Sequence, residues 1–155
     1  MIRPAEKRDI PELYRLLRQV NDVHALGRPD LFIPGSSKYT PEELDALLDD
    51  PDRPVFVCTE DDHAVQGYAF CQRVNYQGDH NMVDRREIYI DDICVDEAVR
   101  GRHVGTRIYE YVVDWARREG VDRITLNVWS LNPAAMAFYQ SLGMTPFKVG
   151  MEKVL

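Results

Sequence analysis

The fold is decided by the stretch Val95-Asp96-Glu97-Ala98-Val99-Arg100-Gly101-Arg102-His103-Val104-Gly105-Thr106-Arg107-Ile108. A strand-like run from Glu87 to Val95 leads into a short loop rich in Arg and Gly. From Val104 onward apolar residues recur at steps of three and four, which indicates a helix. A helix that begins directly after such a loop points its unpaired N–H groups, and the positive end of its dipole, toward the loop. The arrangement predicts a binding site for a phosphate or pyrophosphate group.

The patterns on either side of this stretch indicate one α+β (mixed α/β) domain over residues 1–155, with the order β-α-α-β-β-β-α-β-α-β. Asp9 with Glu12 is expected to form the capping box of the first helix, and Thr40 with Glu43 that of the second. The other expected elements are strands at 1–3, 54–59, 64–74, 87–95, 123–128 and 145–155, a tight turn at 60–63, and helices that begin at Val104 and Asn132.

Composition narrows the class of protein. With 45% hydrophobic and 29% charged residues, the chain is typical of a globular domain. It has no apolar run near the roughly 18 residues of a membrane span and no signal peptide at its N-terminus, so we expect no membrane partner and a cytoplasmic location. A net charge of −7 argues against nucleic-acid binding and is compatible with a cationic substrate such as an amine. The four histidines lack metal-ligand spacing, and the cysteines are expected to be reduced, buried thiols: Cys58, Cys71 and Cys94.

Two motifs of the sequence resemble those of the GNAT superfamily of N-acetyltransferases. The family's loop pattern is Gln/Arg-x-x-Gly-x-Gly/Ala, and this chain has Arg100-Gly101-Arg102-His103-Val104-Gly105. About thirty residues later, Asn132-Pro133-Ala134-Ala135-Met136-Ala137-Phe138-Tyr139-Gln140-Ser141-Leu142-Gly143-Met144 is similar to the pattern Asn-x-x-Ala-x-x-Phe-Tyr-x-x-x-Gly-Phe/Met. The resemblance is specific from about Ile88 to Met144. It implies a GNAT-like central sheet, mixed but mostly antiparallel, flanked by helices.

His103 departs from this family pattern, because it occupies the position of the first motif glycine. If the position requires a positive φ angle, a histidine costs about 1–3 kcal/mol there. Its imidazole then either lies near a phosphate oxygen or faces solvent without a role.

The resemblance implies that the chain binds acetyl-CoA and releases coenzyme A. The backbone of the strand before the loop would pair with the pantetheine arm, and the loop would wrap the pyrophosphate through its N–H groups. Asn132 would both cap its helix and contact the cofactor, while Tyr139 would lie near the thioester sulfur. The implied cofactor contacts are Ile93, Cys94, Val95, Arg100, Gly101, Arg102, His103, Val104, Gly105, Thr106, Asn132 and Tyr139.

Acetyl transfer to an amine needs a base and an acid, because an amine with a pKa near ~10.4 is protonated at neutral pH and cannot attack. For the base we predict Asp92, with Asp91 second and Glu87 third. Strand alternation places Asp92 and Cys94 on one face, and adjacent carboxylates in so apolar a strand are costly unless they meet water, a cation or substrate. The alternative is that these acids pair with neighbouring arginines. Tyr139 is the predicted acid that protonates the leaving thiolate, the alternative being that it only packs its helix against the sheet.

The acceptor is expected to be a small-molecule amine or an amine of a peptide or protein. The first two helices, the loop between them and the loop at 76–84 are expected to select it, through His24, Asp30, Phe32, Tyr39 and Tyr76. Trp129 is expected to pack in the core, with a place in the cleft as the alternative.

Three other questions stay open at this point. A non-catalytic domain of the same fold that senses acyl-CoA is the alternative function. Cys94 is expected to be a small strand residue and not an acyl-carrying nucleophile. A homodimer is open as well, because the expected strand at 147–155 could add to the sheet edge of a partner.

Overall fold

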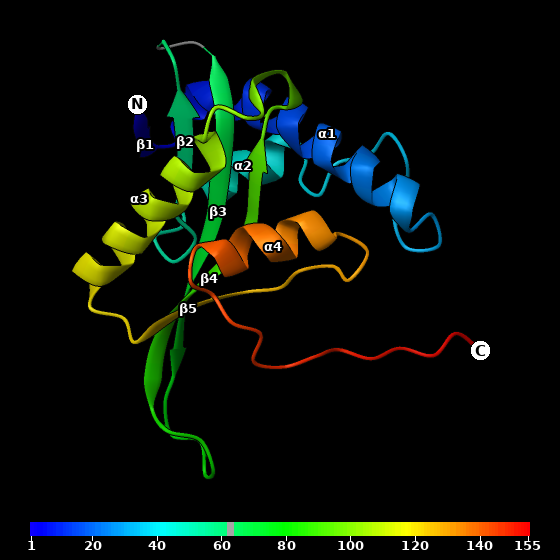
Figure 1. The fold of residues 1–155 in the computed structure, drawn as a ribbon. Coiled ribbons are helices and arrows are strands. Elements are labelled where there is room, and N and C mark those ends of the chain that lie inside the picture. Colours follow the sequence, from blue (N-terminus) through cyan, green and yellow to red (C-terminus); the bar gives the residue numbers. More distant parts are fainter. Residues whose placement is uncertain (62–63) are drawn as a thin grey trace.

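A mixed sheet runs through the molecule, and helices cover both of its faces (Figure 1). The protein is represented by a computed structural model, which describes residues 1–61 and 64–155. In these residues five strands follow the order β1-β2-β3-β4-β5, with antiparallel pairing up to β4 and parallel pairing between β4 and β5. The predicted mixed, mostly antiparallel sheet is confirmed. The strands are β1 (Ile2–Pro4), β2 (Val55–Thr59), β3 (Val65–Tyr76), β4 (Arg85–Val95) and β5 (Arg123–Leu126).

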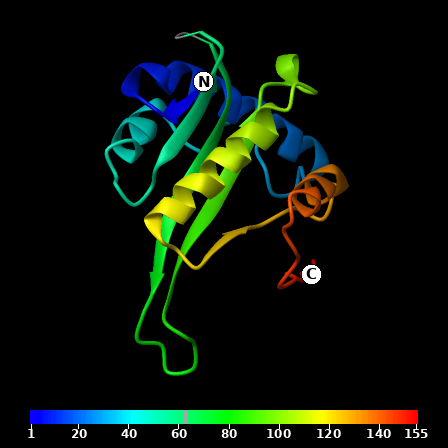
Figure 2. The same ribbon diagram turned by 60° about the vertical axis from the view of Figure 1, so that its left-hand side comes forward.

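The helices lie in two layers, one on each face of the sheet (Figures 1 and 2). Helices α1 (Ile10–Gly27) and α2 (Pro41–Leu47) bury leucines against one face, and α3 (Val104–Glu119) packs on the other beside α4 (Pro133–Ser141). Short 3-10 helices, η1 (Lys7–Asp9) and η2 (Glu97–Val99), precede α1 and follow β4. Among the described residues, no helix combines the length and the hydropathy of a membrane span.

Strand β2 shows why the sheet has two cores. All five of its residues are buried, because alternate side chains enter opposite layers. Val55 and Val57 belong to the core beneath α1 and α2, whereas Phe56 and Cys58 belong to the core beneath α3. A strand covered on both faces is expected to be continuously apolar, as this one is.

The two predicted capping boxes have different outcomes. Thr40 caps α2 as predicted, since its side chain accepts a hydrogen bond from the N–H of Glu43. The box predicted for Asp9 with Glu12 is wrong. The Asp9 carboxylate instead accepts hydrogen bonds from the N–H of Glu6, at 2.8 Å, and from the Arg3 guanidinium, at 2.7 Å. It therefore ties η1 to the edge strand β1, and it is buried.

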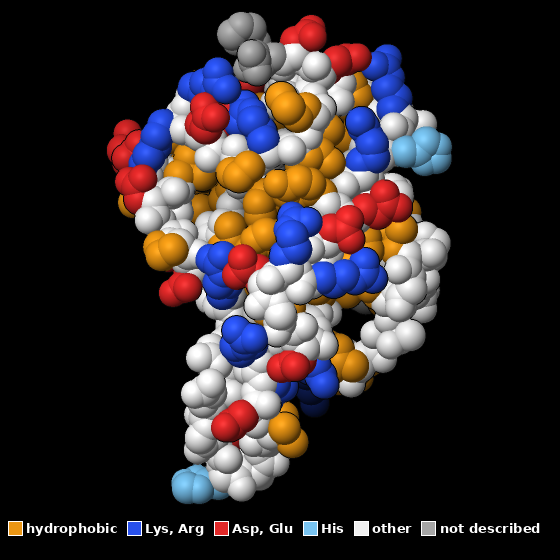
Figure 3. All heavy atoms as spheres, turned by 90° about the vertical axis from the view of Figure 1, so that its left-hand side faces the viewer, with side chains coloured by type: hydrophobic (Ala, Val, Ile, Leu, Met, Phe, Trp, Pro, Cys, Tyr) orange, Lys and Arg blue, Asp and Glu red, His pale blue; other side chains and the backbone are white. Residues whose placement is uncertain are grey.

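Three segments differ from the predicted boundaries. The β3–β4 hairpin is longer than expected and projects from the body of the molecule as an arm (Figure 3). Strand β5 ends at Leu126, not at residue 128. The closing strand predicted at 145–155 is wrong, because this segment is extended and exposed and pairs with no strand of the described chain. The tight turn expected at 60–63 lies partly outside the described residues.

Candidate active site

Strands β4 and β5 diverge at the centre of the site. Their parallel pairing runs from Glu87↔Arg123 to Ile90↔Leu126 and stops there, whereas β4 continues to Val95. Beyond Ile90 the chain of β4 pairs with β3 along one edge only. The backbone of Ile93, Cys94 and Val95 consequently has an edge without a strand partner in the described chain.

A bulge in β4 brings two carboxylates to one side of the sheet. Phe70 pairs with Asp92 and Cys71 pairs with Ile90, so Asp91 is an extra residue on its strand. The predicted alternation holds after the bulge, because Cys94 lies in the core beneath α1 while Ile93 and Val95 pack on the α3 side. The extra residue turns Asp91 to the α1 side as well, which strict alternation did not predict.

Asp92 is a partly buried carboxylate that keeps one strong hydrogen bond. The Tyr68 hydroxyl donates to its Oδ2 over 2.6 Å. Burial raises the pKa of Asp92 to about 6, and the charge of Asp91 adds to this, although the Tyr68 hydrogen bond and the Lys38 charge act in the opposite direction. A carboxylate with this pKa is mostly ionised at pH 7 and is still basic enough to take a proton.

Asp91 and Glu87, the other two candidate bases, are each held by a cation. The Lys38 ammonium lies 2.7 Å from Asp91 Oδ2, and the Tyr39 hydroxyl donates to the same oxygen over 3.4 Å. Glu87 is buried and accepts from Arg85 Nε at 2.7 Å, with Arg123 at 3.6 Å. The alternative of pairing with an arginine is therefore realised at Glu87, whereas the partner of Asp91 is a lysine from the loop between α1 and α2.

Tyr139 projects from α4 on the other side of the sheet. Its ring packs against the α3 core, with centroids 6.3 Å from Tyr109 and 5.1 Å from Phe138. Burial raises the pKa of the Tyr139 phenol well above its usual value, and the charge of Asp92 and the neighbouring Tyr109 add to the effect. The phenol therefore stays protonated through the neutral range.

The loop before α3 contains a residue in the left-handed region of backbone conformation. His103 has φ 57° and ψ 21°, and it is the one non-glycine residue with positive φ among the described residues. This conformation costs about 1–3 kcal/mol. The His103 side chain is exposed and makes no capping hydrogen bond. The first N–H groups of α3, at Val104, Gly105 and Thr106, have no acceptor within their own helix.

Gly105 has a packing role at the start of α3. A Cβ atom built there would lie 3.4 Å from Val95 Cγ2 and 3.4 Å from Phe138 Cζ. The residue is thus small where α3, β4 and α4 meet. At the start of α4 the Asn132 side chain accepts a hydrogen bond from the N–H of Ala135 at 3.1 Å, which confirms the predicted cap.

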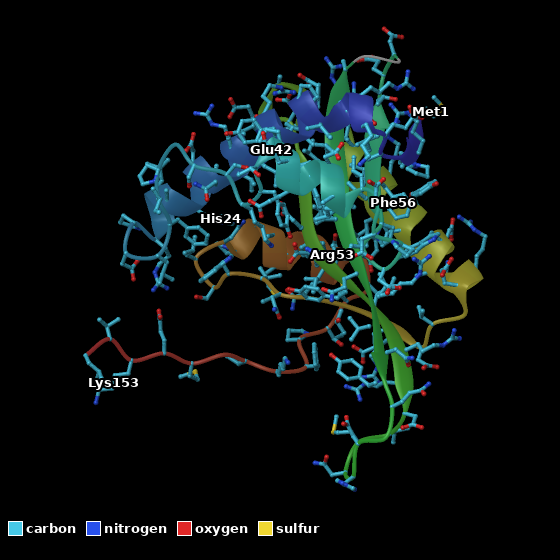
Figure 4. The ribbon with its side chains drawn as sticks, turned by 180° about the vertical axis from the view of Figure 1, so that it is seen from behind. Met1, His24, Glu42, Arg53, Phe56 and Lys153 are labelled. Atoms are coloured by element: carbon cyan, nitrogen blue, oxygen red, sulfur yellow. The ribbon has the colours of Figure 1, made fainter. Side chains whose placement is uncertain are left out.

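A groove of about 1630 Å³ lies where β4 and β5 diverge. Among the described residues, its lining leaves out the β4 edge at 93–95, the loop before α3 and Asn132. Asp91, Asp92 and Tyr139 all line it, together with an aromatic cluster at the C-terminal end of α1. In that cluster the His24 ring stacks on Phe32 at 4.9 Å, and Trp129 meets Phe32 edge-on at 5.4 Å. Figure 4 shows His24 on this part of α1. The expectation that Trp129 is a core residue is wrong, since its side chain is 41% exposed.

The other residues expected to select the acceptor lie elsewhere or act indirectly. The Tyr39 hydroxyl contacts Asp91, and its ring stacks on Phe70 with centroids 5.8 Å apart. Tyr39 therefore helps to hold Asp91 in place. Asp30 pairs with Arg28 on the surface, and Tyr76 lies at the far end of β3 on the projecting hairpin. Sequence reasoning missed Lys38, Tyr68 and Tyr109. Tyr68 is brought beside Asp92 by the register of β3 and β4, in which it faces Cys94, and the sequence pattern of one strand does not state that register.

Cys94 is buried, and its thiol has low reactivity at neutral pH. Burial raises the pKa of its thiol to about 12, so it is protonated at neutral pH. A protonated thiol is a poor nucleophile, which agrees with its prediction as a strand residue. Among the residues that the structure describes, no group of three or more His, Cys, Asp and Glu side chains is placed to hold a metal ion.

The raised pKa of Asp92 has a consequence for stability. Its folded-state pKa of about 6 exceeds the ordinary 3.8, so the carboxylate binds its proton more tightly in the native protein. Its ionisation therefore destabilises the fold as the pH rises through this window. We expect Asp92→Asn to raise the free energy of unfolding by about 1–3 kcal/mol at pH 8 and by much less at pH 4, as measured by urea denaturation.

Asp114→Asn is the control for this experiment, because Asp114 is an exposed partner of Arg117 on α3. Its effect should be small at both pH values. An equal gain from Asp92→Asn at pH 4 and pH 8 would contradict the assigned ionisation.

The sequence and the fold are similar to those of known proteins. Residues 20–144 match the acetyltransferase (GNAT) family. The chain is 28% identical to thialysine N-epsilon-acetyltransferase of Bos taurus over 153 residues, which span 92% of this chain and 82% of the bovine protein. It superimposes on a solved mutant of the BH1408 protein from Bacillus halodurans with a TM-score of 0.95 and 33% identity, over 100% of this chain and 99% of that one. An aminoglycoside acetyltransferase from a soil metagenome shares the fold, with a TM-score of 0.76 and 18% identity over 100% of this chain and 95% of that one.

Proposed function

Because the chain belongs to the acetyltransferase (GNAT) family, we propose that it moves an acetyl group from acetyl-CoA to a primary amine by direct attack in a ternary complex. One observation carries the proposal. A carboxylate with a pKa of about 6, Asp92, and a protonated phenol, Tyr139, line one groove where β4 and β5 diverge. This is the base and acid pair that acetyl transfer to an ammonium group requires.

The residues that would hold acetyl-CoA lie outside the lining of this groove, on β4, in the loop before α3 and at the start of α4. The unpaired edge of β4 from Ile93 to Val95 suits an extended amide-bearing arm, which would add to the sheet as a strand does. The exposed loop at 100–103 offers two arginines to a diphosphate, and the first turn of α3, which begins at Val104, offers uncapped N–H groups. The Asn132 Oδ1 caps α4, which leaves its amide nitrogen for the cofactor. When bound, acetyl-CoA supplies the thioester that the amine attacks.

The protein's own groups would act in sequence. Asp92 takes a proton from the bound ammonium group, directly or through a water molecule, so that the amine becomes a nucleophile. A backbone N–H on the free edge of β4 stabilises the oxyanion that develops. Tyr139 then donates its phenolic proton to the departing sulfur. Tyr68 holds Asp92 in place through its hydrogen bond.

The groove favours a cationic acceptor. Asp92 supplies negative charge to the groove, whereas the charge of Asp91 is neutralised by Lys38. The aromatic surfaces of His24, Phe32 and Trp129 line the same groove. A carboxylate binds an ammonium group through an ion pair, and aromatic rings bind it through cation–π interactions. The name of the bovine relative specifies acetylation of an amine on an amino acid, which supports an amine of a small molecule or of a peptide. The described cysteines are free and buried, which supports a cytoplasmic location.

The proposal is tested with acetyl-CoA and a panel of amines. We expect calorimetry to show acetyl-CoA binding and at least one amine to release free thiol. We expect Arg100→Gln combined with Arg102→Gln to weaken acetyl-CoA binding about 5- to 30-fold, because two exposed charge-assisted contacts at ~0.5–1 kcal/mol each are lost.

The matched control is Arg117→Gln combined with Arg118→Gln. These two arginines lie in the last turn of α3, at the opposite end of that helix from the loop. This variant should bind acetyl-CoA as the wild-type protein does. Binding without thiol release from any amine would favour the non-catalytic acyl-CoA sensor. Equal weakening by both double variants would remove the loop from the cofactor site.

A further inference from the structure

The groove contains a primary amine of the protein itself. The chain has four lysines, at positions 7, 38, 148 and 153. Lys38 and Lys148 line the groove that the candidate base and acid also line. Lys148 belongs to the exposed C-terminal segment, whereas Lys38 is hydrogen-bonded to the bulge of β4. If the groove receives amines, Lys38 carries the functional group of a substrate inside it.

Lys38 lies in the loop between α1 and α2, and its side chain reaches β4. Its Nζ donates a hydrogen bond to Asp91 Oδ2 over 2.7 Å and lies 5.6 Å from the centroid of the Tyr39 ring. Asp91 directly precedes Asp92, and the bulge turns both carboxylates to the same side of the sheet. The Lys38 side chain is 49% exposed, so its ammonium is held at the bulge and is still accessible from the groove.

The Lys38 side chain has the protonation state of an amine acceptor before reaction. Burial acts to lower its pKa, but the hydrogen bond to Asp91 and the charge of that carboxylate outweigh burial, so the pKa is raised. Lys38 is therefore an ammonium group at neutral pH and cannot attack a thioester until a base takes one of its protons. An amine that enters the groove from solution has the same requirement. Acetylation of Lys38 by the protein should therefore depend on Asp92.

We propose that Lys38 is an acetylation site of this protein and that the protein's own active site modifies it. The step rests on the proposed function, which supplies acetyl-CoA as the donor. Asp92 takes a proton from the Lys38 ammonium, and the neutral Nζ attacks the carbonyl carbon of the thioester. The N–C bond forms and the C–S bond breaks, and the leaving sulfur receives the phenolic proton of Tyr139. The second proton lost by Nζ restores the phenol, and the proton on Asp92 passes to solvent.

Acetylation of Lys38 changes the charge of the groove. The modified side chain is a neutral amide and no longer forms an ion pair with Asp91. Asp91 then becomes a second carboxylate that is available to an acceptor ammonium, beside Asp92. The pKa of Asp92 should rise, because the Lys38 charge acts to lower it in the unmodified protein. The acetylated protein is therefore expected to require a higher pH for reaction with an added amine.

The test incubates the full-length protein with acetyl-CoA and without an added amine, and follows each lysine by mass spectrometry of peptides. Lys7 is the matched internal control. Its Nζ is also held by a carboxylate, with Asp49 Oδ2 at 2.8 Å, and its side chain is 42% exposed, but it does not line the groove. We expect Lys38 to be acetylated at least about tenfold faster than Lys7, because the groove holds it near the thioester. An equal rate at the two lysines would overturn the proposal.

Two variants test whether the transfer is catalysed at this site. Asp92→Asn should slow the acetylation of Lys38 about 100-fold or more and leave the slow chemical acetylation of Lys7 unchanged. Lys38→Arg keeps a cation for Asp91, but a guanidinium does not lose its proton and is not acetylated. The mass of the intact protein should therefore rise less in Lys38→Arg than in the control variant Lys7→Arg. A wild-type rate at Lys38 in Asp92→Asn would contradict catalysis, and equal uptake by the two arginine variants would exclude Lys38 as the site.

The kinetic order and the reaction with added amines complete the test. Transfer within one chain predicts a first-order rate constant that does not change with protein concentration, and a rate constant that rises with concentration would overturn the proposal. Thiol release with the panel of amines is measured on the same protein. An amine that reacts while Lys38 stays unmodified would overturn this inference and leave the proposed function in place. If neither an amine nor Lys38 is acetylated, the proposed function fails as well.

Discussion

Asp92→Asn is expected to lower kcat about 100- to 10,000-fold and to abolish the acidic limb of the pH–rate profile. In the wild-type protein the rate should rise with pH through about 6, because Asp92 must lose its proton before it can accept one from the amine. Asparagine keeps the size of the side chain and an oxygen for the Tyr68 hydrogen bond, but it is not a base. Steady-state kinetics from pH 5 to pH 9 measures both effects.

Asp91→Asn is the comparison that separates the two carboxylates of the bulge. Asp91 is neutralised by Lys38 at 2.7 Å, so its loss should reduce kcat less than tenfold and leave the acidic limb in place, shifted through the changed charge near Asp92. If Asp91→Asn removed the limb and Asp92→Asn retained it, the roles of the two carboxylates would be reversed. Unchanged kcat in both variants would exclude the bulge from proton transfer.

Tyr139→Phe is expected to have the second large effect, a fall in kcat of about 10- to 10,000-fold with little change in acetyl-CoA affinity. Phenylalanine keeps the ring that packs on the α3 core and removes only the hydroxyl. Burial raises the pKa of Tyr139, so the wild-type rate should not fall through loss of this proton until well above pH 10. Pre-steady-state release of thiol, together with calorimetry of acetyl-CoA, separates the chemical step from binding.

Tyr109→Phe is the matched control for this variant. Tyr109 lines the same groove, and its ring lies 6.3 Å from that of Tyr139. Loss of its hydroxyl should change kcat by less than a factor of about five, since we assign it no proton transfer. Comparable losses in the two variants would show that the effect comes from the polarity of the groove. A fully active Tyr139→Phe would remove Tyr139 from the mechanism.

The features of the fold that could be predicted from the sequence are those that depend on residues close to one another along the chain. The loop and the start of α3 follow from apolar periodicity and the placement of glycines, and the caps at Thr40 and Asn132 from side chains that bond to the backbone three residues on. Asp9 shows the limit of this reasoning. The same local signal was present, but Arg3 from the edge strand captured the carboxylate instead.

The C-terminal segment shows a second limit. Its alternation is that of a strand, yet a strand needs a neighbouring edge, and no local pattern states whether the edge lies in the same chain. Trp129 is similar, because its residue type favours burial whereas its position after β5 leaves it in the groove. Both outcomes depend on where the sheet ends.

What the sequence by itself determined is the family, the order of the strands and α-helices as far as α4, and the loop before α3. It also indicated Asp92 and Tyr139 as candidates. These depend on periodicity and on motifs that lie within a few turns of the chain. Only the tertiary structure decided which of the two adjacent carboxylates pairs with a cation. The bulge opposite Phe70 turned both to one side, burial and Tyr68 tuned Asp92, and Lys38, more than fifty residues away, neutralised Asp91. Burial and charge pairing are set by residues that meet only after folding, so no local pattern carries them.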